Sequence, residues 1–424
     1  MHQLFFKIRK MKRLLLVSLL TFIFIFSYII DSYACTSAII SGKITADGRP
    51  ILWKHRDTGE ENNRIEFFKG GKYTFIALVD SPDRGGAAWT GTNSAGFSIM
   101  NTASYNIKDD DEKEMDMEGV LMYNALAECK NLKDFEKFLD NHPRPIRVEA
   151  NFGVIDAEGG AAYYEVNNTK WIKVDANDPR IAPNGYLIYT NFSYTGRFDE
   201  GMGYIRHRTA TEIISRQAPL KNITAHWIFN NLSRSYYHSL LGIDLMKDQF
   251  SPEKGSGWAI DQDYIPRKST SASIVIQGVK PGENPEMTTM WTILGYPPVG
   301  VAVPLWEKAG ADQPGIMLMG KANENSEMCD YALALKSNIF SIVRGNGSRY
   351  LNFNLIHNSS GNGYMQQLAP TEAAVYDLYK EAIEKWRQNG INLNELKAIN
   401  SQMESVVKEA YNKILIESYI AGQK

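Results

Sequence analysis

Cys35 is the residue whose position in this sequence most directly suggests chemistry. It follows Ser32-Tyr33-Ala34, which has small residues three and one positions before a possible cut and so fits a signal cleavage site. Cleavage after Ala34 would leave Cys35 with a free α-amine, a group whose ordinary pKa is about 7.7–8.0. Such an amine can accept the proton of its own thiol, so Cys35 would become a nucleophile without a separate histidine.

The segment before Cys35 predicts a secretory signal over residues 1–34. A basic start, which includes Lys12 and Arg13, leads into an almost unbroken apolar run at 14–30. Met11 is an alternative start for the same signal. We therefore expect an exported protein, either periplasmic, extracellular or at the cell surface. Three alternatives stay open: an uncleaved membrane anchor, a lipid on Cys35 that blocks its amine, and a purely structural cysteine.

The composition excludes several other classes of function. The chain has 424 residues and a net charge of −2 with no basic block, so no nucleic-acid partner is expected. Its seven histidines show no metal-ligand spacing, and we expect neither a metal nor another cofactor. Cys129 and Cys329 are either a disulfide or two buried thiols, and the sequence does not decide between them.

Hydrophobic periodicity predicts the elements that must position Cys35. Alternation and bounding turns predict strands at 36–44, 50–54, 64–68, 73–79, 87–91, 96–100, 150–156, 161–166, 171–174, 186–190, 270–277 and 288–294. Helices are predicted at 118–129, 132–140, 204–216, 224–231, 371–388 and 393–419. The acidic stretch 106–116 predicts an exposed loop.

Strands and helices come in blocks instead of alternating, which favours an α+β fold of layered sheets with flanking helices over a doubly wound parallel sheet. Within it we expect one catalytic domain over residues 35–369 and a helical C-terminal extension over 370–424. The extension has no predicted role beyond packing, a possible homo-oligomer interface or a lid.

The first two predicted strands bring further charged residues to Cys35. A hairpin returns its second strand beside the first, and Asp57 follows that return. A carboxylate there could hold the α-amine, while Lys54 or Arg56 could lower the pKa of the thiol. The alternative for Asp57 is a turn cap before Gly59.

These residues together resemble a known family. Cys35-Thr36-Ser37, then Gly42-Lys43 with Asp47-Gly48, then a basic residue and Asp57 are similar to the N-terminal-nucleophile (Ntn) linear amide hydrolases. That group includes choloylglycine hydrolases, penicillin V acylases, isopenicillin N acyltransferases and carcinine hydrolase-like proteins. The resemblance covers roughly residues 35–304 and leaves out the helical tail.

The resemblance implies a fold and a reaction. It implies an αββα sandwich in which the Cys35 thiolate attacks an amide carbonyl and forms an acyl-thioester. Oxyanion donors are needed, and the Thr190-Asn191 segment resembles the family's Thr-Asn segment. Asn191 is therefore the predicted side-chain donor and Asn101 a second candidate, whereas Asn93 is interpreted as a turn residue.

The sequence also departs from the family pattern. The family has an arginine within a serine run of a later strand, but here Arg267 precedes that run. Arg267 is expected to take the role from a shifted position, and Lys54 stands where bile-salt hydrolases have an arginine. Lys54, Arg56 and Arg267 are thus the predicted substrate-binding residues. These departures argue against bile salts and penicillin V as substrates.

The leading hypothesis is an exported amidase acting on a small linear amide. The alternatives are an acyltransferase that passes the acyl group to an amine, and a lipidated binding protein without catalysis. Aromatic side chains could line an acyl pocket or simply pack in the core; the candidates are Phe192, Tyr194, Tyr236, Tyr237 and Trp291.

Overall fold

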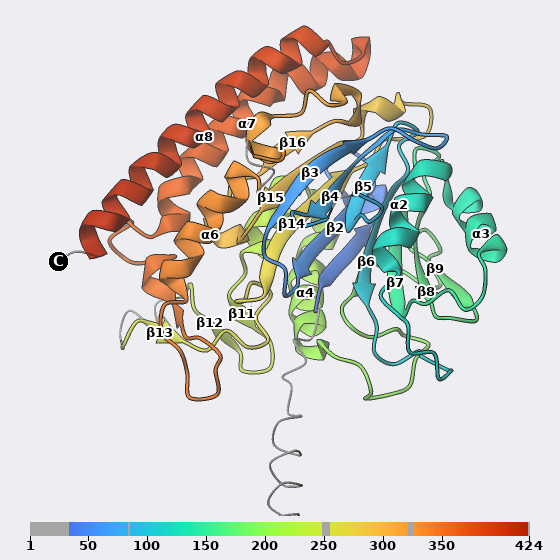
Figure 1. Ribbon diagram of the computed structural model, residues 1–424, viewed down its shortest axis with the longest axis horizontal. Helices are drawn as coiled ribbons and strands as arrows, with labels where there is room; N and C mark the ends of the chain where they lie inside the picture. Colours follow the sequence, from blue (N-terminus) through green and yellow to red (C-terminus); the bar gives the residue numbers. More distant parts are fainter. Residues whose placement is uncertain (1–33, 84, 248–254, 321–324, 423–424) are drawn as a thin grey trace, which may run out of the picture. The chain divides into compact units, whose positions relative to one another are not determined.

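Two antiparallel sheets form the centre of the protein in the computed structural model (Figure 1), which describes residues 34–83, 85–247, 255–320 and 325–422. The predicted signal segment, except for Ala34, lies outside these residues. The six-stranded sheet has the order β10 (Tyr186–Tyr189), β1 (Thr36–Ile40), β2 (Ile51–Asp57), β14 (Thr270–Gln277), β15 (Thr289–Leu294), β16 (Val303–Leu305).

The second sheet has seven strands in sequence order. They are β3 (Asn63–Phe68), β4 (Phe75–Asp80), β5 (Thr90–Asn93), β6 (Ser98–Ala103), β7 (Ala150–Ile155), β8 (Ala161–Val166) and β9 (Trp171–Asp175). Two small two-stranded sheets pair β11 (Tyr237–His238) with β12 (Ile243–Asp244), and β13 (Trp258–Ala259) with β17 (Leu351–Asn352).

Helices cover the outer face of each sheet. The helices α2 (Glu118–Glu128) and α3 (Leu132–Asn141) pack on the seven-stranded sheet and share one apolar cluster with it. The helices α4 (Tyr204–Gln217) and α5 (Ala225–Ile228) pack on the six-stranded sheet in another cluster. Apolar side chains of both sheets, such as Ile39 and Tyr163, meet in the largest cluster. The predicted sandwich of two antiparallel sheets between helices is therefore confirmed.

The predicted hairpin at the start of the described chain is also confirmed, although its first strand is shorter than expected. β1 ends at Ile40 because residues 42–44 turn into a short 3₁₀ helix, where the Ser41 hydroxyl accepts a hydrogen bond from the Lys43 amide. β1 and β2 pair with Ser37 opposite Lys54 and Thr36 opposite His55. Opposed residues share a face, so this register directs Cys35 and Lys54 toward the same side.

The C-terminal part differs from prediction in two ways. The helix α6 (Glu327–Ile339) was not predicted, and α7 (Tyr364–Asn389) begins before Pro370 instead of after it. The amide groups of Gly363 and Asn358 donate to the Gln366 side chain, which fixes the start of α7. The predicted domain boundary at 369/370 falls inside α7, and the described residues from Ala34 onward form one compact unit.

The last two helices pack against one edge of the six-stranded sheet (Figure 1). α7 and α8 (Leu393–Gly422) run beside each other, and Glu372 of α7 forms a buried ion pair with Arg234. Glu372 also accepts a hydrogen bond of 2.9 Å from the amide of Ala302, just before the edge strand β16. Trp306, just after that strand, contacts the rings of Tyr379 and Trp386.

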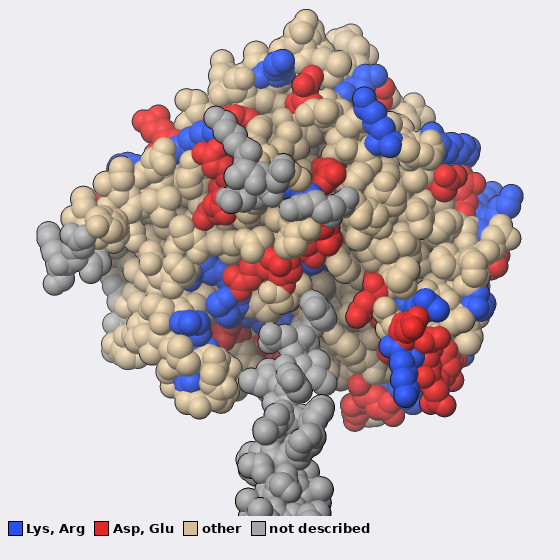
Figure 2. Space-filling view, viewed as in Figure 1, with Lys and Arg blue, Asp and Glu red and all other residues tan. Residues whose placement is uncertain are grey.

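The acidic loop is exposed as predicted. Figure 2 shows acidic side chains gathered at the lower right, over the segment that joins β6 to α2. Asp109, Asp111, Glu114 and Asp116 are all solvent-exposed there. No helix within the described ranges combines the length and apolarity needed to cross a membrane.

Candidate active site

Cys35 lies directly before β1, next to the end of β2. Its side chain is buried, and the residue is 7% exposed. The Cys35 Sγ lies 4.0 Å from the backbone oxygen of Asp57. The hairpin register explains this contact, because residue 35 precedes the Thr36–His55 pair and thus returns beside the last residues of β2.

Asp57 is held on both sides by residues of the β14 region. Its carboxylate accepts hydrogen bonds of 2.6 and 3.1 Å from the Arg267 guanidinium, and one of 2.6 Å from the Thr270 hydroxyl. Thr270 is opposite Asp57 in the β2–β14 register. Arg267 also donates to the backbone oxygen of Ala34 at 2.8 Å. Arg267 and Asp57 thus meet at the Ala34–Cys35 peptide, the bond whose cleavage would create the α-amine.

Lys54 links the two sheets close to Cys35. Its ammonium donates hydrogen bonds of 2.6 Å to the Asn101 side-chain oxygen and to the backbone oxygen of Trp89. Burial lowers the pKa of Lys54 to about 8, and a nearby Cys35 thiolate opposes that shift. An ammonium has only donors, so the oxygen of the Asn101 amide must face Lys54 and its nitrogen must face away.

Asn191 is fixed by a buried arginine from α4. The Arg206 guanidinium donates to the Asn191 side-chain oxygen at 2.7 Å, and also to the backbone oxygen of Cys35 at 2.6 Å and the Thr36 hydroxyl at 2.7 Å. The Asn191 side-chain nitrogen donates to the backbone oxygen of Ala103 at 3.0 Å. Burial lowers the pKa of Arg206 to about 9, so its charge persists at neutral pH.

Gly203 makes room for the Arg206 guanidinium at the start of α4. Its backbone has φ of 79°, in the left-handed region that favours glycine. A Cβ at this position would lie 2.3 Å from an Arg206 side-chain nitrogen and 3.0 Å from the Thr190 Cβ. The turn before α4 is therefore shaped around Arg206.

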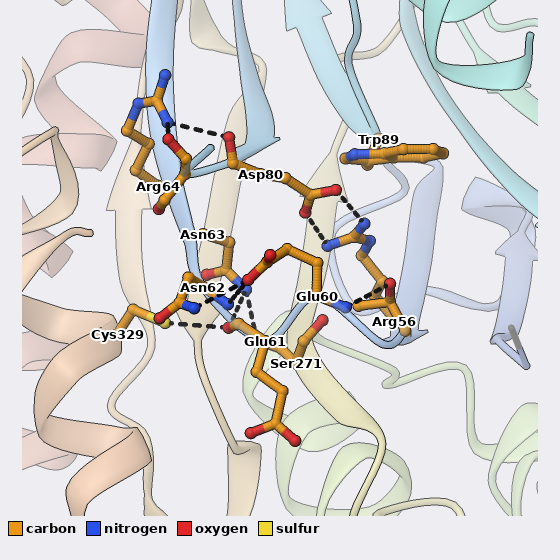
Figure 3. Close-up of polar contacts among 12 residues, drawn as sticks. Arg56, Glu60, Glu61, Asn62, Asn63, Arg64, Asp80, Trp89, Ser271 and Cys329 are labelled. Atoms are coloured by element: carbon orange, nitrogen blue, oxygen red, sulfur yellow. Dashed lines mark hydrogen bonds and ion pairs between the residues drawn. The ribbon is translucent and has the colours of Figure 1, made fainter. Parts of the chain in front are cut away.

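Arg56, a predicted substrate-binding residue, is occupied by an internal ion pair. Its guanidinium donates hydrogen bonds of 2.6 and 3.0 Å to the two carboxylate oxygens of Asp80 and lies 4.9 Å from the ring centre of Trp89 (Figure 3). The Arg56 side chain is only 4% exposed. This geometry ties the Arg56 guanidinium into an internal ion pair, whereas Lys54 and Arg206 are the cations that interact with Cys35.

The predicted aromatic residues do not form a single pocket. Phe192 and Tyr194 follow Asn191 and contact each other, and Phe192 stacks on Tyr204. Tyr236 and Tyr237 instead line a cavity of about 730 Å³ between α4, α5 and α7 that does not include Cys35. Trp291 stacks on Tyr376 in the helix-covered face of the six-stranded sheet.

The other two cysteines are structural. Cys129 and Cys329 are free, buried thiols in different apolar clusters. Burial raises the pKa of Cys129 to about 12 and that of Cys329 to about 11. Both thiols stay protonated at neutral pH, and neither has the reactivity of a thiolate.

Sequence reasoning missed two residues of this site. Thr270 and Arg206 contact Asp57 and Asn191, respectively, but neither belongs to the motif that identified Cys35. For Thr270, its position three residues after Arg267 at the start of a predicted strand was the available signal. Arg206 offered none, because an arginine in the first turn of an amphipathic helix normally faces solvent.

Comparison with known proteins adds structures but no sequence family. No family model and no curated protein sequence matches the chain. An ortholog of N-acylethanolamine-hydrolyzing acid amidase from Caenorhabditis elegans is 13% identical with a TM-score of 0.34, over 57% of this chain and 92% of that one. Penicillin V acylase from Agrobacterium tumefaciens is 12% identical with a TM-score of 0.38, over 64% and 85%.

A mutant of conjugated bile acid hydrolase from Clostridium perfringens is also similar, at 14% identity and a TM-score of 0.39, over 61% of this chain and 89% of that one. Because every one of these TM-scores is below 0.5, the assignment of an activity depends on the geometry around Cys35.

Proposed function

We propose that the protein is an exported N-terminal-cysteine amidase that cleaves a small linear amide through an acyl-thioester on Cys35. The observation that carries this proposal is the pair of contacts made by Arg267. One guanidinium binds the Asp57 carboxylate and the backbone oxygen of Ala34. A buried carboxylate is thereby held at the one peptide bond whose cleavage would free the α-amine of Cys35.

The reaction follows from the groups around Cys35. The α-amine takes the thiol proton, and the thiolate attacks the carbonyl carbon of the amide. Negative charge then develops on the carbonyl oxygen, where side-chain amides such as those of Asn191 and Asn101 can stabilise it. The protonated α-amine gives its proton to the leaving amine as the C–N bond breaks. Water then hydrolyses the thioester and releases the acid.

Charge near Cys35 supports the same chemistry. Lys54 and Arg206 are cations close enough to interact with a thiolate at Cys35. Cations next to a thiol favour the thiolate, which is the nucleophilic form. At Cys129 and Cys329, burial outweighs the nearby lysines Lys72 and Lys336 and raises the pKa of both thiols.

The decisive experiment begins with the intact mass and N-terminal sequence of the exported protein. An unmodified chain that starts at Cys35 is expected, followed by an acyl adduct on Cys35 when N-acyl 4-nitroanilides are supplied. Cys35→Ala should fold and show no turnover. A lipid on Cys35, a start elsewhere or a fully active Cys35→Ala variant would refute the proposed mechanism.

A further inference from the structure

We infer that Arg206 is a positioning residue that sets the Asn191 amide against the Cys35 nucleophile; this inference rests on the proposed function. Asn191 and Cys35 are far apart in sequence. Asn191 follows the end of β10, and Cys35 precedes the start of β1. One guanidinium contacts both, through the Cys35 backbone oxygen and the Asn191 side-chain oxygen. Arg206 thus fixes the nucleophile relative to the predicted oxyanion donor.

The chemistry of the contact determines the orientation of the amide. A guanidinium carries only donors, so the atom of Asn191 that faces Arg206 must be its oxygen. The Asn191 nitrogen is consequently turned away from Arg206, and it donates a hydrogen bond to the backbone oxygen of Ala103. Without Arg206 only the Ala103 contact would orient the amide, and a rotated amide would present its oxygen, which would repel a developing oxyanion.

The surroundings indicate that this arrangement is built for the guanidinium. Arg206 is 1% exposed, and a buried charge is costly unless it is paired or well hydrogen-bonded. Its three acceptors are neutral atoms at 2.6–2.7 Å, and the neighbouring Arg267 lowers its pKa further. Gly203 leaves the space that the guanidinium fills. If the side chain at position 206 only filled space in the core, an apolar residue would be sufficient.

Lysine cannot replace the planar fork of arginine at such a site. One guanidinium reaches the oxygens of Cys35, Thr36 and Asn191 at once, whereas an ammonium is a single point charge. Arg206→Lys should therefore keep the charge but recover only part of the function.

Two reagents separate positioning from general support of the fold. Iodoacetamide alkylates a thiolate without building charge on a carbonyl oxygen, whereas 4-nitrophenyl acetate acylates it through an oxyanion. In the exported protein, Arg206→Gln should slow acetylation of Cys35 by roughly 10²-fold, as expected for a lost oxyanion donor. Alkylation should slow by less than about threefold, because Lys54 remains close to the thiol and still favours the thiolate. Intact mass and 4-nitrophenol release give the two rates.

Arg208→Gln is the matched control, because Arg208 lies on the same helix but pairs with Glu212 on the surface. It should behave as wild type with both reagents. If Arg206→Gln does not fold, Gly203→Ala should displace the guanidinium and give the same selective loss. Equal losses with both reagents, or no loss of acetylation, would overturn the inference.

The outcome for the wild type distinguishes the two proposals. A wild-type Cys35 that is alkylated but never acetylated would refute the amidase mechanism and, with it, the role of Arg206. A wild type that is acetylated, together with an Arg206→Gln variant that is acetylated equally fast, would refute the role of Arg206 alone.

Discussion

Lys54 and Asn101 are joined by a hydrogen bond of 2.6 Å that connects the six-stranded sheet to the seven-stranded sheet. The contact resembles that between Arg206 and Asn191, since in both a buried cation holds an asparagine by its oxygen. Both candidate oxyanion amides are therefore oriented by a cation that lies near Cys35.

Lys54→Met should lower the rate of Cys35 acetylation by 4-nitrophenyl acetate by roughly 10–100-fold, because Asn101 loses its orientation and Cys35 loses a nearby cation. Combining Lys54→Met with Asn101→Ala should add little, since the two residues act as a unit. Lys43→Met, which removes an exposed ammonium away from Asn101, is the control. Fully additive losses would contradict this coupling.

Asp57→Asn should abolish most of the acetylation while leaving an alkylatable thiol. The neutral amide cannot hold the α-amine as an ion pair, and loss of a general base or its partner costs typically 10²–10⁴-fold. Arg267→Met should produce a loss of the same kind because Arg267 fixes the Asp57 carboxylate. Single-turnover rates across pH 5–9 provide the measurement. A wild-type pH profile in Asp57→Asn would remove Asp57 from the mechanism.

Glu118 provides a test of pH-dependent stability. Burial raises its pKa from 4.5 to about 7. The folded state therefore holds a proton that the unfolded state releases, so Glu118 contributes stability below pH 4.5 that is lost as the pH rises to about 7. Glu118→Gln should remove this loss, and its stability relative to wild type should increase over that interval by on the order of 3 kcal/mol.

Urea unfolding at several pH values between 4.5 and 7.5 measures this difference, in which the contributions of other groups largely cancel. Parallel stability curves for the two proteins would show that Glu118 keeps an ordinary pKa.

The ion pair between Arg234 and Glu372 should be essential for stability. Both side chains are under 10% exposed, and their ion pair joins the helical tail to the segment that follows α5. Glu372→Gln leaves a buried guanidinium without its counter-charge, which should cost about 3–5 kcal/mol in urea unfolding. Lys130→Met breaks the exposed pair with Glu158 and should cost at most about 1 kcal/mol. If both variants lost the same free energy of unfolding, burial would not explain the stability of the Arg234–Glu372 pair.

Strands of the sandwich could be predicted because their side chains alternate between two buried faces, as at Ile39 and Ile40. The helix α6 was missed although Met328, Ala332, Leu335 and Ile339 follow helical spacing. Lys336 lies on that same buried face, where its ammonium donates to the backbone oxygen of Thr270. A charged residue therefore interrupts the apolar spacing that would have indicated a helix.

Pro370 misled the prediction of the tail for a different reason. Proline normally ends a helix because it lacks an N–H group. Here burial of Tyr364 and Leu368 and the Gln366 cap outweigh that missing bond.

At the site, local spacing gave the positions of Cys35, Lys54 and Asp57, because one hairpin holds all three. The partners of those residues could not be predicted in the same way. Arg206 reaches Cys35 across 171 positions of sequence, and only the stacking of α4 on the six-stranded sheet makes the contact. The ion pair of Arg56 with Asp80 likewise depends on the approach of the two sheets.

The covered edge of the six-stranded sheet at β16 should limit aggregation of the protein in concentrated solution. Exposed edge strands recruit other chains because their amide groups seek partners. Here the Ala302 amide is taken by Glu372, and Pro304 has no amide hydrogen to offer. With Trp306 covered by α7, this side of the sheet is closed to a foreign strand, which protects the folded protein from edge-to-edge aggregation.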